Sequence, residues 1–557
     1  MDGRGRPRCG VRQREHVAVL PRSQTPRMYG CTMHGSREAS GSPRPRVPRP
    51  RGEAQGRNPE MHEHDESDSL VVPGKQANKA AQAAAEPVEG RGLAKGNLRE
   101  HDASRTQRRS NAPSALERIR EVARREKTVR FTALLHHIYD VERLRAAYRA
   151  LEPKAAAGVD GVSWGQYGQH LEQNLQDLSG RLRRGAYRAR PARRVRIPKP
   201  DGRQRLLGVP ALEDKIVQRA TAEVLAAIYE QDFLGFSYGF RAGRSAHHAL
   251  DAVSVGIRKR KVSWVLDADI RGFFDTLDHG WLVKFLEHRI ADRRVIRLIQ
   301  KWLTAGVLEE GRQIRSEVGT VQGGSISPLL ANVYLHYVLD LWTQQWRTQR
   351  ARGDVILVRY GDDFVVGFER RREAEQYLAA LRARLERFGL ALHADKTRLI
   401  EFGRFAAGAR ASRGEGKPET FNFLGFTHFC AKTREGWFTV RRKTMRQRWQ
   451  AKLREVAAEL RRRMHRSVPE QGRYVQAVVR GHANYYGVPG NSRAISAFRL
   501  GVIRIWRRLL SRRSQKARLS WKRMAQLVRR WVPLVRLRYV DPDGHLRVMT
   551  QGKSPVR

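Results

Sequence analysis

The chain has 557 residues, more than one hydrophobic core usually covers, so about two or three domains are expected. Lys and Arg number 108 against 56 Asp and Glu, and the formal net charge of +52 predicts nucleic acid as the partner, although charge specifies no reaction. Three cysteines with no paired spacing exclude a disulfide framework or a zinc site and favour a cytoplasmic location. No apolar run is long enough to span a bilayer, so we expect a soluble protein with no membrane partner.

The N-terminal part of the chain changes character near Ser114. Residues 1–111 are basic, rich in Pro, Gly, Ser and Gln and poor in large apolar residues, which predicts a mostly disordered segment. Apolar residues at helical spacing follow from Ser114 to about residue 151. At 193–210 the sequence predicts two short basic strands that flank a turn at 200–202.

Helical and strand patterns then mix up to about Phe429. The clearest strand patterns are VSWVLDADI at 262–270 and VILVRYGDDFVVGF at 355–368, and the mixture predicts an α+β fold. From Trp449 onward the pattern is helical. Residues 441–557 contain 31 Lys and Arg against 5 Asp and Glu, which predicts a separate basic helical domain.

Two acidic residues, Asp362 and Asp363, lie at a tight turn between two apolar strands. Asp is common in turns for conformational reasons, so an isolated Gly-Asp-Asp is more often structural than functional. Here the apolar flanks predict that the carboxylates lie in the protein interior. Unpaired charge is costly there unless a cation is bound, which favours a metal site.

A second acidic cluster lies at 267–279, where an apolar strand runs into a helix. Side chains alternate along a strand, so Asp267 and Asp269 share one face, whereas Asp275 and Asp278 fit a helix N-terminal position better. If the strand of Asp269 lies beside the 360–363 hairpin, three carboxylates converge. Such a site would hold two divalent cations, as in-line phosphoryl transfer requires.

Eight sequence blocks occur in the order typical of reverse transcriptases, and over 96–537 the chain resembles group II intron-encoded reverse transcriptase/maturases. The blocks are GVDG at 158–161, IPKP at 197–200 with Arg205, YGFR at 238–241, DIRGFFD at 269–275, QGGSISPLLAN at 322–332, YGDD at 360–363, KT at 396–397 and FLGF at 423–426.

The resemblance implies a right-hand polymerase and a two-ion Mg²⁺ site whose ligands and catalytic residues are Asp269, Asp362 and Asp363. Its expected divisions are 112–440 for fingers and palm, 441–480 for the thumb, 481–540 for the maturase domain X and 541–557 for a C-terminal tail.

The resemblance also implies a nucleotide site. Lys199 and Arg205 match residues that grip the incoming triphosphate, although alone they would be ordinary surface charge. Gln322 and Gly323 match a motif that lines the nucleotide pocket and lets the template approach the backbone closely, which glycine permits. Phe274 matches the aromatic residue that excludes a 2′-hydroxyl and so favours deoxynucleotides, although an aromatic residue in an apolar run is usually core.

The C-terminal block RGHANYYG at 480–487, with the helical sequence after it, resembles the maturase domain. Basic residues interleaved with aromatic residues would there form a surface for intron RNA. Without the resemblance, the arginines would be a solvated face and Tyr485, Tyr486, Trp506 and Trp521 mostly helix packing; which of these aromatics face RNA stays open. The candidate RNA-binding residues are Arg507, Arg508, Arg512, Arg513, Lys522 and Arg523.

The function implied by the resemblance is that of an RNA-directed DNA polymerase that copies group II intron RNA into cDNA and assists splicing. Its expected partners are intron RNA, deoxynucleoside triphosphates and a DNA primer at the target, and no HNH endonuclease pattern follows residue 537. Two alternatives stay open. A splicing-only RNA-binding maturase would have little reason to keep three convergent carboxylates, and a reverse transcriptase of another element is disfavoured by the maturase region.

Overall fold

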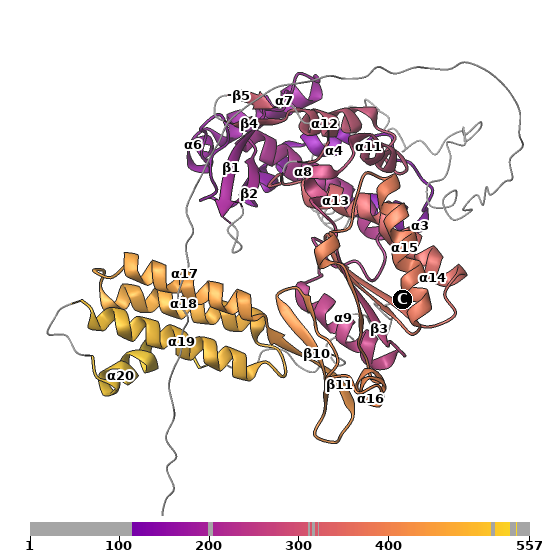
Figure 1. The fold of residues 1–557 in the computed structure, drawn as a ribbon. Helices are drawn as coiled ribbons and strands as arrows, with labels where there is room; N and C mark the ends of the chain where they lie inside the picture. Colours follow the sequence, from indigo (N-terminus) through magenta and orange to yellow (C-terminus); the bar gives the residue numbers. More distant parts are fainter. Residues whose placement is uncertain are drawn as a thin grey trace, which may run out of the picture. The chain divides into compact units, whose positions relative to one another are not determined.

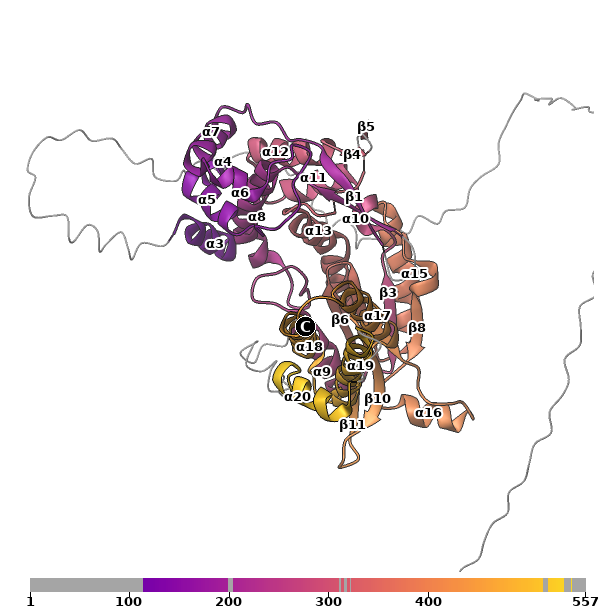
Figure 2. The same cartoon turned by 90° about the vertical axis from the view of Figure 1, so that its left-hand side faces the viewer.

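The computed structural model describes residues 114–198, 204–309, 312–314, 318–320, 322–513, 519–534 and 542 (Figures 1 and 2). The predicted disordered segment 1–111, Lys199, the turn at 200–202 and the tail 541–557 apart from Pro542 lie outside the described residues. Within the described part, helices and strands mix as the sequence predicts, and the α+β prediction is confirmed.

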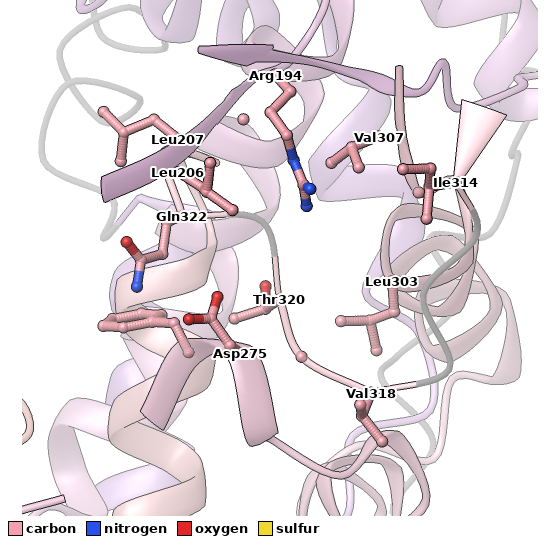
Figure 3. Close-up of a pocket in the computed structure, with 14 residues that line it drawn as sticks. Arg194, Leu206, Leu207, Asp275, Leu303, Val307, Ile314, Val318, Thr320 and Gln322 are labelled. Atoms are coloured by element: carbon pink, nitrogen blue, oxygen red, sulfur yellow. The ribbon is translucent and has the colours of Figure 1, made fainter. Parts of the chain in front are cut away.

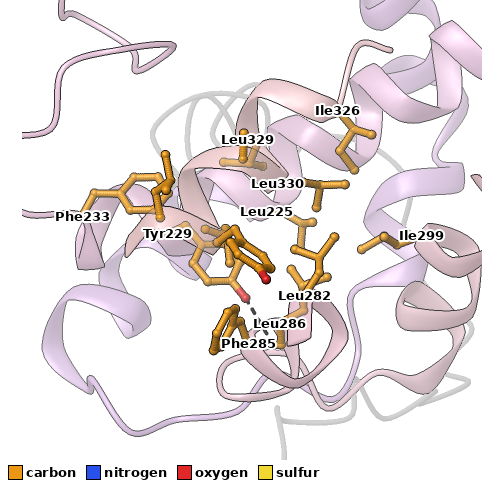
Figure 4. Packing of buried hydrophobic residues seen from close by; sticks show 14 of the residues in the cluster. Leu225, Tyr229, Phe233, Leu282, Phe285, Leu286, Ile299, Ile326, Leu329 and Leu330 are labelled. Atoms are coloured by element: carbon orange, nitrogen blue, oxygen red, sulfur yellow. Dashed lines mark hydrogen bonds between the residues drawn. The ribbon is translucent and has the colours of Figure 1, made fainter. Parts of the chain in front are cut away.

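The first helices pack around one large apolar core. They are α3 (Ala115–Arg125), α4 (Leu135–Tyr139), α5 (Val141–Arg149), α6 (Trp164–Gly168), α7 (Leu171–Arg183) and α8 (Leu212–Asp232). The first begins where the sequence indicates, because the Ser114 side chain accepts a hydrogen bond from the Glu117 amide. In the core, the Tyr229 hydroxyl donates to the Leu286 carbonyl at 3.2 Å, so this buried polar group keeps a partner (Figure 4).

Further helices follow along the chain. They are α9 (Ala246–Lys259), α10 (Phe273–Thr276), α11 (His279–Glu287), α12 (Arg293–Thr304), α13 (Ser327–Leu335), the π-helix η1 (His336–Asp340), α14 (Leu341–Gln349), α15 (Arg371–Arg387), the short helix η2 (Ala394–Lys396) and α16 (Ala406–Ser412). Several of them, such as α11, α12 and α13, complete this core. Asp278 caps α11 by accepting from the Trp281 amide at 2.7 Å, as its position in the sequence predicts.

The predicted basic hairpin belongs to a four-stranded sheet. Its order is β2 (Gln204–Val209), β1 (Ala192–Pro198), β4 (Val307–Glu309) and β5 (Arg312–Ile314). Strands β1 and β2 pair antiparallel, whereas β1 and β4 pair parallel.

A second, antiparallel sheet, which we call the central sheet, carries the acidic motifs. Its order is β6 (Val355–Tyr360), β7 (Asp363–Phe368), β3 (Trp264–Asp269) and β8 (Arg398–Glu401). Leu266 and Val366 pack into the large core, while Val265 and Val365 pack into a second core with α9. The sheet is therefore buried on both faces, and Asp267 and Asp269 share the face of Val265.

The second core also holds a three-stranded sheet of order β11 (Phe438–Thr444), β10 (Phe426–Lys432) and β9 (Phe421–Phe423). After it come α17 (Arg446–Arg462), α18 (Val468–Tyr486), α19 (Ser492–Ser511) and α20 (Trp521–Trp531), which we call the helical region. Helix α19 lies beside α17 and α18 (Figure 1).

The helical region has a core of its own. Val456, Val475, Trp506 and Met524, one from each helix, belong to the same apolar cluster. The expected boundary between thumb and maturase domain, at 480/481, falls inside α18, and the division between them stays a prediction. None of the described helices combines the length and the apolar character that crossing a bilayer requires.

Candidate active site

The register of the central sheet brings the predicted carboxylates to one end of it. Asp269 on β3 is directly opposite Asp363 on β7, and the β6–β7 hairpin pairs Tyr360 with Asp363. Asp362 occupies the turn of that hairpin, next to Gly361 with φ of +69°. The structure therefore places Asp269 beside the 360–363 hairpin, the condition on which the expected convergence of three carboxylates depends.

This end of the sheet has a surplus of negative charge. Burial, together with the nearby carboxylates of Asp267, Asp362 and Asp269, raises the pKa of the Asp363 carboxyl to about 7. Two cations offset part of the charge: Lys396 Nζ pairs with Asp269, and Arg398 Nη2 lies 3.4 Å from Asp267 Oδ2.

The donor set fits a hard divalent cation, because it consists of carboxylate oxygens that repel one another when no cation lies between them. Among the described residues, no three His, Cys, Asp or Glu side chains are yet arranged closely enough to hold a metal ion. The amine of Lys396 instead bonds to an oxygen of Asp269. An ion at this site would have to displace that amine and draw the carboxylates together.

A buried arginine in strand β6, not singled out from the sequence, supports the turn of the hairpin. Arg359 is fully buried, and its guanidinium donates to Asp340 at 2.7 and 2.6 Å and to the Gly361 carbonyl at 2.9 Å. Further bonds go to Asn332 Oδ1 at 3.0 Å and Ser237 Oγ at 2.8 Å. The signal in the sequence was a charged residue within an apolar strand. A charged side chain in such a strand can be buried only if it has a partner of opposite charge.

Two of the expected nucleotide-site residues line one cavity of about 310 Å³ between β2, α10 and the segment before α13 (Figure 3). Half-buried Phe274 and Gln322 contribute to its wall, together with Arg194, Leu206 and Asp275. Phe274 is thus at a cavity rather than deep in the core, although its ring also packs edge-on against Phe273 at 5.4 Å.

The other three expected nucleotide-site residues are placed differently. Lys199 lies outside the described residues, and of Arg205 the structure describes only the backbone, in β2. Gly323 has φ of +120°, and an added Cβ would lie 2.5 Å from the Gly208 carbonyl oxygen. The close approach that requires glycine here is therefore that of strand β2.

The six candidate RNA-binding residues divide into two groups. Arg508, Arg512, Lys522 and Arg523 are exposed. Arg507 is half-buried, donates to the Leu519 carbonyl at 3.2 Å and lies 4.3 Å from the ring centre of Trp521. Arg513 donates to the Met464 carbonyl at 2.6 Å. Arg507 and Arg513 therefore bond to the backbone of the segments that connect the helices, whereas Arg508, Arg512, Lys522 and Arg523 are exposed to solvent.

The four aromatics whose orientation the sequence left open also separate. Trp506 is fully buried and donates to Gln471 Oε1 at 3.0 Å. Trp521 is 51% exposed. Tyr485 and Tyr486 pack against the second core, on the ring of Phe426. Of these four, Trp521 alone is predominantly exposed.

The part of the chain that contains the central sheet is similar to known proteins. Residues 197–428 match the family described as reverse transcriptase (RNA-dependent DNA polymerase). The chain is 36% identical to protein YkfC of Escherichia coli over 310 residues, which are 49% of this chain and 81% of that protein. It is 35% identical over 234 residues to the group II intron-encoded protein LtrA of Lactococcus lactis, 41% of this chain and 38% of LtrA.

A similar match, 31% identical over 223 residues, links the chain to the putative COX1/OXI3 intron 1 protein of Saccharomyces cerevisiae and covers 40% of this chain and 26% of that protein. Intron-encoded proteins thus recur among the relatives, and the end of the central sheet carries the acidic pattern expected of a polymerase. The chain belongs to the reverse transcriptase family of RNA-directed DNA polymerases, among the reverse transcriptase/maturases of group II introns.

Proposed function

We propose that the chain copies group II intron RNA into DNA at the end of the central sheet, with Asp269, Asp362 and Asp363 as ligands of two Mg²⁺ ions. The observation that carries the proposal is the pairing of Asp269 with Asp363 beside the hairpin turn, in a setting of surplus negative charge. When bound, magnesium would favour ionisation of the primer 3′-hydroxyl and offset charge on the triphosphate.

The cavity lined by Phe274 and Gln322 is the proposed seat of the incoming deoxynucleoside triphosphate. In that position the Phe274 ring would lie under the sugar and leave no room for a 2′-hydroxyl. Lys199 and Arg205, on the hairpin of β1 and β2, would hold the triphosphate. On this assignment the β2-β1-β4-β5 sheet belongs to the fingers and the central sheet is the palm.

The helical region is the proposed site of RNA contact. Its first helices would form the thumb and touch the primer-template, and the exposed residues Arg508, Arg512, Lys522 and Arg523 would bind phosphates of intron RNA during splicing. A DNA 3′ end at the target is the proposed primer. The small number of cysteines supports a cytoplasmic location.

Primer extension by the purified full-length protein tests the proposal. A DNA primer on an unstructured RNA template is supplied with Mg²⁺ and either deoxy- or ribonucleotides. We expect extension with deoxynucleotides at a rate about 100-fold above that with ribonucleotides, because the Phe274 ring would leave no room for a 2′-hydroxyl. Binding of RNA without any extension would contradict the polymerase function and favour a splicing-only protein.

A further inference from the structure

The hydroxyl of Tyr485 joins the last turn of α18 to a turn beside the candidate active site. It donates a 2.8 Å hydrogen bond to the backbone carbonyl of Leu424, between β9 and β10. Packing fixes the half-buried ring, whose centre lies 5.8 Å from that of Phe426 and 5.2 Å from that of His247. The Tyr485 carbonyl also accepts from His247 Nε2 at 2.7 Å. Both the ring and the backbone of Tyr485 are thus held independently of the hydroxyl.

Leu424 connects that hydroxyl to a candidate metal ligand. Its backbone amide lies close enough to the Asp363 carboxyl to counter part of the rise that burial causes in the pKa of that group, while its carbonyl accepts the bond from Tyr485. One residue therefore touches both the helical region and the acidic end of the central sheet. A shift of this turn would move the amide dipole that faces Asp363.

The turn needs such support, because its backbone is strained. Leu424 has φ of +48° and Gly425 has φ of +80°. Glycine adopts this region freely, but in leucine the Cβ crowds the backbone, and the conformation persists only where its surroundings fix it. The Met445 amide holds the Gly425 carbonyl at 3.1 Å, and the Tyr485 hydroxyl holds the Leu424 carbonyl.

We infer that Tyr485 is a positioning residue for DNA synthesis: its hydroxyl fixes the turn at 424–425, and the Leu424 amide in turn orients the Asp363 carboxylate. The inference rests on the proposed function, because it takes Asp363 as a metal ligand. It gives the helical region a second role, as part of the frame of the active site. Loss of the hydroxyl should therefore weaken the use of Mg²⁺ without loosening the fold.

Two matched variants of the full-length protein separate the hydroxyl from the ring. Tyr485→Phe removes one oxygen and keeps the packing. Tyr486→Phe is the control, because its ring lies 4.9 Å from that of Tyr485 and its hydroxyl has no hydrogen bond to any described residue. Wild type and both variants are compared in primer extension on a short RNA template over a range of Mg²⁺ concentrations. The readouts are kcat, the half-saturating Mg²⁺ concentration and the thermal unfolding midpoint.

For Tyr485→Phe we expect kcat to fall about tenfold and the half-saturating Mg²⁺ concentration to rise about threefold or more, with an unfolding midpoint within about 2 °C of wild type. Tyr486→Phe should stay within about twofold of wild type in both kinetic quantities. The inference is overturned if Tyr485→Phe matches wild type in both, or if the two variants lose kcat equally with unchanged Mg²⁺ dependence. A wild type without extension would instead overturn the proposed function, and the inference with it.

Discussion

The central sheet and the helical region carry their charges in opposite ways. In and beneath the sheet, Arg359 and Asp340 are fully buried and paired, and Asp363 is surrounded by other carboxylates. In the helical region, basic side chains such as Arg508 and Lys522 are exposed and acidic residues are few. A buried charge affects stability through one fixed partner. Exposed cations affect RNA binding through the total number of phosphates that they neutralise. We therefore expect large, residue-specific effects in the sheet and small, additive effects in the helical region.

The largest effect on stability is expected at the buried ion pair of Arg359 and Asp340. Asp340→Asn should destabilise the protein by about 3 to 5 kcal/mol, because it leaves the buried Arg359 guanidinium without its counter-charge. The matched control is Glu375→Gln, which breaks an exposed pair with Arg371 and should cost less than about 1 kcal/mol. Urea unfolding measures both. Equal destabilisation by the two variants would remove the contrast between buried and exposed charge.

A second test asks whether Phe274 acts in the cavity or in the core. Phe274→Ala should raise the ratio of ribo- to deoxynucleotide incorporation about ten- to 100-fold, because the ring would no longer block the 2′-hydroxyl. Phe273→Leu is the comparison, since Phe273 is buried and should change stability and not the ratio. The ratio is measured by primer extension at equal folded fractions. If Phe274→Ala has the same ratio of ribo- to deoxynucleotide incorporation as wild type, Phe274 has only a packing role.

The smallest effects are expected on the helical region. Each exposed cation that contacts a phosphate releases counterions, so Arg508, Arg512, Lys522 and Arg523 replaced together by Gln should lower the log-log salt slope of intron-RNA affinity by roughly one per contact. Extension on a short template should stay within about twofold. Arg507→Gln with Arg513→Gln should mainly lower the unfolding midpoint, because these side chains bond to backbone carbonyls. If the variant with all four substitutions has the same salt slope as wild type, those four residues do not contact RNA phosphates.

Local patterns were enough to predict much of the fold and the acidic site. Strand alternation placed Asp267 and Asp269 on one face, which the structure shows. Helix-start chemistry offered Asp275 or Asp278 as an N-terminal residue of a helix, and the structure shows Asp278 as the cap of α11. The mixed α+β fold follows from the same periodicities. These features depend on residues only a few positions apart, which a sequence displays directly.

Features that depend on tertiary approach were not predictable. The partner of Arg359 is 19 residues away, and Tyr485 is 61 residues from the carbonyl that it holds. The close approach of β2 to Gly323 is another contact that the sequence did not indicate. Likewise Arg507 and Arg513 looked like their exposed neighbours, because a sequence does not show which guanidinium finds a backbone carbonyl.

On the proposed assignment, the carboxylates at the end of the central sheet hold the metals for DNA synthesis, while RNA is bound elsewhere. The most direct measurement compares wild type with Asp269→Asn and Asp362→Asn, for primer extension and for intron-RNA affinity at matched salt. Each substitution should reduce extension by more than about 1000-fold, because it removes an anionic ligand, and should leave RNA affinity within about twofold. Robust DNA synthesis by either variant would contradict the assignment.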